Sequence, residues 1–138
     1  MKTIYVGMCA DLIHHGHINI IKTASEYGFV VVGLLSDEAI ATYKRPSVLS
    51  YDQRKIVIES LRDVGMVVVQ RTLSYKDNLE IIRPDYVLHA DDWRSGPQVK
   101  IRKEVIETIN KWDGILVEIP YTEGISSTKL KEYNETNL

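Results

Sequence analysis

The chain has 138 residues, 44% of them hydrophobic and 26% charged, and its formal net charge is −2. This length and composition are typical of one globular domain that buries a sizeable core. The small negative charge argues against a nucleic-acid binder, whose affinity would come from neutralising phosphates.

Cysteine usage and apolar runs indicate a cytoplasmic protein without a membrane partner. Cys9 is the only cysteine in the sequence, so an internal disulfide is excluded and a reducing compartment fits. The first residues contain one lysine and a short apolar run, which does not fit a signal peptide. No apolar stretch approaches the roughly 20 residues that a membrane-spanning helix requires.

Apolar runs alternate with stretches of helical periodicity along the whole chain. In chain order, we predict a strand at 3–6, a helix at 15–27, a strand at 29–35, helices at 37–42 and 51–62, a strand at 66–69, a helix that ends before Pro84, a strand at 86–89, a helix at 99–112, a strand at 115–119 and a last helix from about 126. Gly28 is a helix stop, and Ser50 with Gln53 forms a capping box. The polar residues 132–138 are predicted to be a tail after a domain at 1–131.

Strands that alternate with helices build a parallel sheet whose two faces are both covered by helices. We therefore expect an α/β domain with a doubly wound, five-stranded parallel sheet. In such sheets ligands bind beyond the carboxyl ends of the strands, near the point where the strand order reverses. Polar stretches follow three of the predicted strands at this edge, at 14–17, 91–93 and 126–128.

Residues 11–17, Asp-Leu-Ile-His-His-Gly-His, join the first strand to the first helix. The free amides and the dipole of a helix start suit a phosphate group, and Gly16 lets a ligand approach the backbone closely. His14 and His17 are three residues apart, so their rings can share one face and donate hydrogen bonds to phosphate oxygens. A lone histidine would more often be a half-exposed surface residue, but this spacing directly after a strand favours a phosphate site.

Residues 121–129, Tyr-Thr-Glu-Gly-Ile-Ser-Ser-Thr-Lys, precede the last predicted helix. Gly124 permits a sharp turn, and three consecutive hydroxyl residues, Ser126 to Thr128, lie where the free amides of the helix start are. An ordinary helix cap needs only one of these hydroxyls. The cluster therefore favours a polyphosphate site.

The two segments together resemble the cytidylyltransferases, above all the glycerol-3-phosphate cytidylyltransferases, over nearly the whole chain. That family carries the His-x-Gly-His signature of the nucleotidyltransferase superfamily, here His14 to His17, and an Arg-Thr-Glu-Gly-Ile-Ser-Thr-Thr-Lys block similar to residues 121–129. Residues 51–55 and 91–93 also match. The resemblance implies a Rossmann-like nucleotidyltransferase fold, CTP as the nucleotide substrate and a homodimer.

The resemblance also implies roles for individual residues. His14 and His17 would hold the CTP phosphates and the transition state, together with Lys44 or Arg45, between which an alignment by eye does not decide. The residues that would form the nucleotide pocket are Cys9, Ala10, Gly16, Asp92, Trp93, Tyr121, Thr122, Gly124, Ile125, Ser126, Ser127 and Thr128.

Three further residues are candidates for the acceptor and the metal. Arg62 and Lys76 stand where the family has basic residues and would bind the acceptor, although surface charge explains Lys76 equally well. Magnesium (Mg²⁺) is the expected cofactor and would bridge phosphate oxygens, with few protein ligands. Asp11 is the candidate carboxylate near it by position, and a structural role of Asp11 in the turn is at least as well supported.

Two departures from the family pattern bear on the acceptor. Tyr121 replaces an arginine, which loses a fixed positive fork, and Ala10 replaces a phenylalanine. At both positions the sequence is similar to that of the cytidylyltransferase domain that is fused to phosphoenolpyruvate mutases and acts on 2-hydroxyethylphosphonate. We therefore expect transfer of CMP from CTP to a small phosphonate, with release of pyrophosphate. The alternatives are glycerol 3-phosphate or another phospho-alcohol as acceptor, an adenylyltransferase of the same superfamily, and a non-catalytic nucleotide-binding module.

Overall fold

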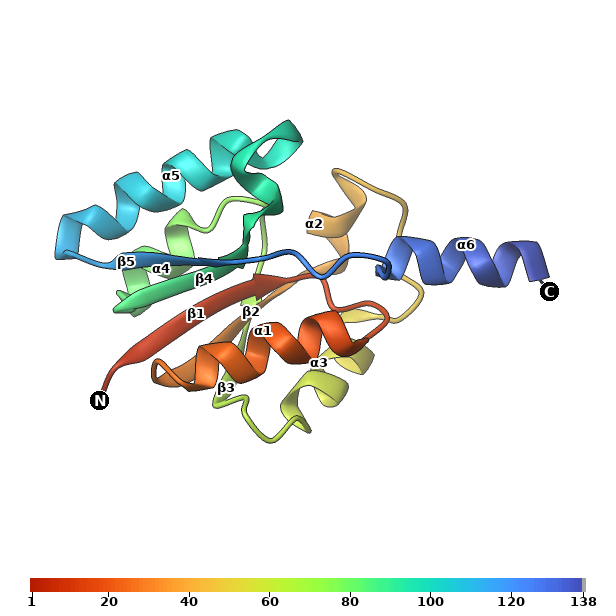
Figure 1. Ribbon diagram of the computed structural model, residues 1–138, viewed down its shortest axis with the longest axis horizontal. Helices are drawn as coiled ribbons and strands as arrows, with labels where there is room; N and C mark the ends of the chain where they lie inside the picture. The colour runs from red at the N-terminus through yellow and green to blue at the C-terminus, as the bar shows by residue number, and fades with distance from the viewer. Residues whose placement is uncertain (138) are drawn as a thin grey trace.

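The computed structural model describes residues 1–137 and contains a five-stranded, all-parallel sheet (Figure 1). The strands are β1 (Thr3–Met8), β2 (Phe29–Leu35), β3 (Met66–Gln70), β4 (Tyr86–Ala90) and β5 (Ile115–Ile119). Their order across the sheet is β3-β2-β1-β4-β5. The predicted doubly wound, Rossmann-like α/β fold is therefore confirmed.

Helices cover both faces of the sheet. They are α1 (His15–Ser25), α2 (Asp37–Ala41), α3 (Tyr51–Glu59), α4 (Lys76–Ile82), α5 (Val99–Ile109) and α6 (Ser127–Asn137), with short 3-10 turns at Asp91–Arg94, Gly96–Gln98 and Asn110–Trp112. Helices α1 and α3 lie on one face, and α4 and α5 lie on the other (Figure 1). Helix α6 projects from the edge at which the strands end (Figure 1).

Alternation along β1 divides the core into two layers. Ile4 packs with Ala24 of α1 and Ile58 of α3, whereas the next residue, Tyr5, packs with Leu79 of α4. All of these side chains are fully buried. The burial of both faces explains why the strands read as continuous apolar runs.

Some boundaries differ from those predicted from the sequence. Strand β1 continues to Met8 and β4 to Ala90. The polar stretch 91–96, which the sequence predicts to be a loop, contributes to the two 3-10 turns at Asp91–Arg94 and Gly96–Gln98. Helix α6 continues to Asn137, across the boundary predicted at residue 131, so residues 132–137 continue this helix. The last residue of the predicted tail, 138, lies outside the described residues.

The strand order reverses beside β1, which pairs with β2 on one side and with β4 on the other. In open parallel sheets this is the place where ligands bind, beyond the carboxyl ends of the strands. The turn that contains both signature histidines follows β1 directly, so the topology puts that turn at the expected binding edge.

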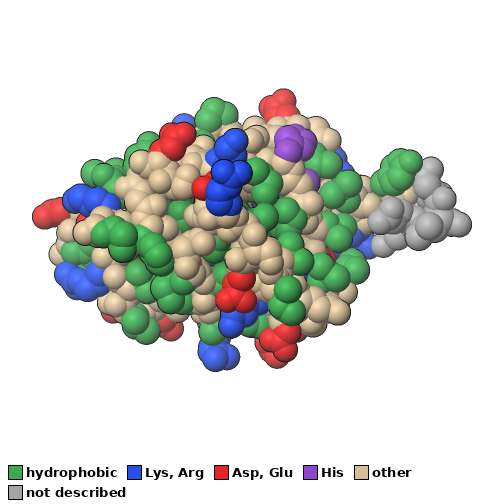
Figure 2. All heavy atoms as spheres, turned by 90° about the horizontal axis from the view of Figure 1, so that it is seen from below, with side chains coloured by type: hydrophobic (Ala, Val, Ile, Leu, Met, Phe, Trp, Pro, Cys, Tyr) green, Lys and Arg blue, Asp and Glu red, His purple; other side chains and the backbone are tan. Residues whose placement is uncertain are grey.

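The surface of the described chain mixes its charges. On the face shown in Figure 2, basic and acidic side chains are interspersed with apolar ones and do not gather into one basic patch. Within residues 1–137, none of the helices combines the length and the apolar character that a membrane crossing would need.

Candidate functional site

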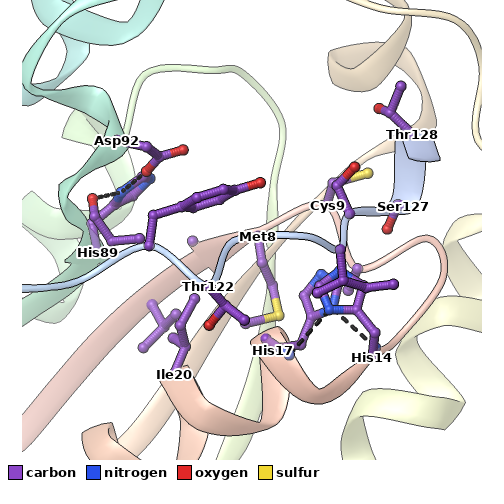
Figure 3. A pocket seen from close by; sticks show the side chains of 18 of the residues that line it. Met8, Cys9, His14, His17, Ile20, His89, Asp92, Thr122, Ser127 and Thr128 are labelled. Atoms are coloured by element: carbon purple, nitrogen blue, oxygen red, sulfur yellow. Dashed lines mark hydrogen bonds and ion pairs between the residues drawn. The ribbon is translucent and has the colours of Figure 1, made fainter. Parts of the chain in front are cut away.

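A cavity of about 250 Å³ opens at the carboxyl ends of β1 and β4. The predicted site residues that line it are Cys9, Ala10, His14, Gly16, His17, Lys44, Asp92, Tyr121, Thr122, Ile125, Ser126, Ser127 and Thr128. Figure 3 shows the histidine turn and the start of α6 at one end, and His89 and Asp92 at the other. The two sequence motifs therefore meet at the same end of one cavity.

The turn before α1 uses both histidines as helix caps. Nδ1 of His14 accepts a hydrogen bond from the Gly16 amide at 3.1 Å, and Nδ1 of His17 accepts one from the His14 amide at 3.2 Å. An accepting Nδ1 carries no hydrogen, so the proton of each neutral ring lies on Nε2. The two ring centroids are 4.1 Å apart. The turn thus provides two adjacent Nε2–H donors, which suit phosphate oxygens.

Burial keeps both rings neutral at ordinary pH. For His14, burial and then the neighbouring charge of His15 lower the pKa. For His17, burial lowers the pKa to about 4, with further contributions from His14 and Lys44. A neutral ring retains the Nδ1 acceptor that caps the helix. Capping and donation from Nε2 are therefore compatible at neutral pH.

Two backbone positions beside the histidines are tightly constrained. A Cβ atom at Gly16 would lie 2.8 Å from Cε1 of His14 and 3.4 Å from Cβ of Thr122, so a side chain there would displace the His14 ring. Ala10 is buried and has a φ of +55°, a left-handed conformation that costs a non-glycine residue about 1 kcal/mol. The structure maintains this strained geometry at the end of β1, next to the cavity.

The start of α6 closes the same end of the cavity. Oγ of Ser126 accepts a hydrogen bond from the Lys129 amide at 3.0 Å and caps the helix. Oγ of Ser127 donates to the Leu12 carbonyl at 3.0 Å and accepts from the Leu12 amide at 3.3 Å. These contacts fasten α6 to the turn before α1. Two helix N-termini therefore face one end of the cavity, where their dipoles favour an anion.

The structure distinguishes between the two candidate cations after α2. Lys44 lines the cavity and lies close enough to His17 to lower the pKa of that ring. Arg45 is exposed and is not part of the cavity lining. The geometry therefore favours Lys44 as the cation that meets the phosphates.

Trp93 supports the other end of the cavity from behind. It was predicted to form the nucleotide pocket, but it is only 1% exposed and does not line the cavity. Its ring stacks on His89, with ring centroids 3.7 Å apart and planes inclined by 3°. His89 and Asp92 form the lining at this end.

Comparison with known proteins identifies the family. A family model described as cytidylyltransferase-like matches residues 4–133. The chain belongs to this family. It is 31% identical over 134 residues to the glycerol-3-phosphate cytidylyltransferase of Staphylococcus aureus, covering 96% of this chain and 94% of that protein. It is 34% identical over 130 residues to the ethanolamine-phosphate cytidylyltransferase of Dictyostelium discoideum, covering 92% of this chain and 35% of that longer protein.

These matches confirm the predicted membership, and the chain is a CTP-dependent nucleotidyltransferase. Solved structures share its fold. A lipopolysaccharide core biosynthesis protein from Thermoplasma volcanium superimposes with a TM-score of 0.73 at 17% identity, covering 91% of this chain and 99% of that chain. A pantoate-beta-alanine ligase from Francisella tularensis superimposes with a TM-score of 0.60 at 17% identity, covering 97% of this chain and 69% of that chain. At such identities the similarity shows the fold alone.

Asp11 is predicted either to lie near magnesium or to have a structural role in the turn, and its contacts in the structure are of the structural kind. It is fully buried, accepts hydrogen bonds from the amides of Val48 at 2.8 Å and Leu49 at 2.9 Å, and pairs with Lys131 at 2.5 Å. In the part of the chain that the structure describes, no three His, Cys, Asp or Glu side chains are grouped to hold a metal ion. Both carboxylate oxygens of Asp11 are therefore occupied by contacts within the protein, and the use of magnesium stays a prediction.

Three other predicted site residues lie outside the cavity lining. Arg62 borders a separate hollow between α1 and the end of α3, and Nζ of Lys76 pairs with Glu80 at 3.9 Å. The cavity geometry gives no support to acceptor binding by either residue. Gly124 has a φ of +82°, which confirms the sharp turn expected of this glycine before α6.

Several lining residues were not predicted from the sequence. They are Val6, Gly7, Met8, Ile20, Leu88, His89, Ala90 and Pro120. Most contribute apolar surface or backbone, and the one with distinctive chemistry is His89. A signal for it was available, because His89 is a polar residue near the carboxyl end of an otherwise apolar strand, at the edge where ligands bind.

Proposed function

We propose that the acceptor of this cytidylyltransferase is a small phospho-alcohol, such as glycerol 3-phosphate or ethanolamine phosphate. The observation that carries the proposal is the convergence of the histidine turn, Lys44 and the start of α6 on one cavity. The relatives named for glycerol 3-phosphate and ethanolamine phosphate, similar over more than nine-tenths of this chain, support this acceptor class.

The proposed reaction is a direct transfer of CMP. An oxygen of the acceptor phosphate forms a bond to the α-phosphorus of CTP. The bond from this phosphorus to the oxygen that bridges the α- and β-phosphates breaks, and its electron pair leaves with pyrophosphate. The acceptor oxygen is already anionic at neutral pH, so no strong base is needed. The protein therefore acts by positioning the reactants and stabilising charge.

The chain offers a donor for each part of this task. The Nε2–H groups of His14 and His17 and the ammonium group of Lys44 would stabilise charge at the reacting phosphates. The free amides at the start of α6 would hold the outer phosphates. In this proposal magnesium accompanies the triphosphate as part of the substrate and needs few protein ligands.

A small phosphonate is the second candidate acceptor, and the observation that favours it is at Tyr121. This residue lines the cavity where the resembling family has an arginine, so a neutral phenol takes the place of a positive charge. Its amide donates to Oδ1 of Asp91 at 3.1 Å, which anchors the loop beside the cavity. The named relatives nevertheless support the phospho-alcohol more strongly.

The test is kcat/KM with CTP for glycerol 3-phosphate, ethanolamine phosphate, 2-hydroxyethylphosphonate and 2-aminoethylphosphonate, measured as pyrophosphate release. We expect the best phospho-alcohol to exceed the best phosphonate by at least about tenfold, which is ~1.4 kcal/mol of transition-state stabilisation. A phosphonate that wins by the same margin would overturn the proposed acceptor. Equal turnover with ATP would overturn the preference for CTP.

A further inference from the structure

His89 occupies the end of the cavity opposite the phosphate-binding turn. It lines this cavity and also a neighbouring one on the α4 and α5 side of the sheet, and its side chain is 17% exposed. Figure 3 shows it beside Asp92, across the cavity from His14 and His17. No role for this histidine follows from the two sequence motifs.

A rigid platform holds the His89 ring. The ring lies flat on Trp93, whose Nε1 donates to Oε2 of Glu118 at 2.7 Å. The same carboxylate accepts hydrogen bonds from Arg102 at 3.0 Å and from Arg94 at 3.1 Å. The Arg102 hydrogen bonds are the main cause that lowers the pKa of Glu118 to about 2. Glu118 therefore stays charged and fixes the indole on which His89 rests.

The tautomer of His89 is opposite to that of the signature histidines. Its Nδ1 lies 2.7 Å from the Ala90 carbonyl oxygen, which can only accept, so Nδ1 carries the hydrogen. Burial lowers the pKa of the ring and keeps it neutral. Nε2 then keeps a lone pair, because the contacts of this ring with the Ala90 carbonyl oxygen at 2.7 Å and with Oδ1 of Asp92 at 3.7 Å both involve Nδ1. The cavity thus has two imidazole donors at one end and an imidazole acceptor at the other.

We propose that Nε2 of His89 accepts a hydrogen bond from the nucleoside half of CTP. The triphosphate is drawn to the turn with His14 and His17, so the nucleoside extends along the cavity toward His89. A nucleoside presents hydrogen-bond donors there, namely the ribose hydroxyls and the 4-amino group of cytosine. The inference rests on CTP as the substrate and is independent of the acceptor.

The test is CTP binding measured by isothermal titration calorimetry without any acceptor. His89→Phe keeps a flat ring for Trp93 and loses the acceptor atom, whereas His89→Gln can present its amide oxygen near the position of Nε2. Inorganic tripolyphosphate is the control ligand, because it engages only the phosphate end. We expect His89→Phe to weaken CTP binding by at least about tenfold, tripolyphosphate binding to stay unchanged, and His89→Gln to recover most of the loss.

Titrations with UTP, 2′-deoxyCTP and 3′-deoxyCTP identify the donor. If the preference of the wild type for CTP over UTP disappears in His89→Phe, the donor is the amino group. If the preference of the wild type for CTP over one of the deoxynucleotides disappears in His89→Phe, the donor is the ribose hydroxyl that this deoxynucleotide lacks. The proposal is overturned if His89→Phe binds CTP like the wild type, if it loses tripolyphosphate binding equally, or if it retains every preference. CTP binding is measured here without an acceptor, so these results do not depend on which acceptor gives the highest kcat/KM.

Discussion

At the residue scale, His14 and His17 each perform two functions with one ring. Nδ1 of each accepts a backbone amide at the start of α1, and this contact places the proton on Nε2. The cap therefore sets the tautomer that a phosphate ligand requires. Because Gly16 leaves room for the His14 ring, the geometry depends on all three residues of the signature.

Replacing His14 or His17 by alanine should lower kcat by at least about a hundredfold. Each substitution removes one hydrogen-bond donor that stabilises the negative charge of the transition state. His15→Ala is the matched control, since His15 is exposed and does not line the cavity, and it should leave kcat nearly unchanged. Steady-state kinetics with CTP and saturating acceptor measures both effects. Near-normal kcat in the His14 and His17 variants would contradict the assignment.

Acid should destabilise the fold through His17. Its folded-state pKa of about 4 lies below the ordinary value of 6.5, so the unfolded chain takes up this proton first as the pH falls. The contribution of His17 is therefore fully present above pH 6.5 and is lost as the pH falls toward 4, by at most about 3 kcal/mol.

Urea unfolding at pH 7 and at pH 5 checks this dependence in the wild type and in His17→Gln. The wild type should lose more of its free energy of unfolding between the two pH values than the variant does. Equal losses would show that His17 is not the group responsible.

Sequence patterns predicted the site residues whose role is local. A histidine or serine at a helix start can be identified from the spacing alone, as at His14, His17 and Ser126. A structural role of Asp11 was among the alternatives, but its partner and the burial of Trp93 could not be predicted this way. Each contact involves a residue far along the chain, Lys131 for Asp11 and Glu118 for Trp93.

At the element scale, buried charges attach the loops around the cavity to the sheet. Arg54 of α3 is completely buried, and its guanidinium donates to the carbonyls of Cys9 at 2.8 Å and Leu35 at 2.7 Å, at the ends of β1 and β2. Asp11 holds the loop before α3 through two amides and holds α6 through Lys131. The loop with Lys44 and the start of α6 are thus fixed relative to the histidine turn.

Lys131→Met should lower the free energy of unfolding by roughly 3–5 kcal/mol, because it leaves the buried Asp11 carboxylate without its counter-ion. Lys129→Met, at an exposed position in the same helix, is the matched control and should have little effect. Chemical denaturation of the two variants measures the difference. Equal losses in both would exclude a stabilising Asp11–Lys131 pair.

Element boundaries were predicted best where an apolar run has clear stops. β2 and β5 begin and end at the predicted residues, since Gly28 and Pro120 bound them. Residues 91–96 were predicted as a loop because they are mostly polar, yet Trp93 is buried there and 3-10 turns form around it. The polar composition of this stretch does not reveal that Trp93 is held by a hydrogen bond from its Nε1 to Glu118 of β5.

At the scale of the whole molecule, the strand order determines where the site lies. Alternating strands and helices predict a parallel sheet, but they do not predict the order β3-β2-β1-β4-β5, which depends on how the helices pack on the sheet. The reversal beside β1 brings the ends of β1 and β4 together. This arrangement places His89 opposite His14 and His17 and joins two motifs from opposite ends of the chain.

The homodimer implied by the resemblance to cytidylyltransferases stays a prediction, as does the cytoplasmic location. Large apolar side chains such as Ile56, Ile81 and Ile115 are exposed on different elements, so apolar surface is available for a second copy. Light scattering on a size-exclusion column at micromolar concentration should give twice the 15.8 kDa of one chain. A single-chain mass would count against the dimer.

The central claim is that the protein transfers CMP from CTP to a phospho-alcohol in this cavity. Phosphorus NMR of the complete reaction tests this claim most directly. The protein is mixed with CTP, magnesium and either glycerol 3-phosphate or ethanolamine phosphate, and all phosphorus species are followed. We predict that each equivalent of acceptor consumed yields one equivalent of pyrophosphate and one of a CDP-linked alcohol, and that neither forms when the acceptor is omitted. Pyrophosphate released without an acceptor, or CTP that remains intact with both acceptors, would contradict the account.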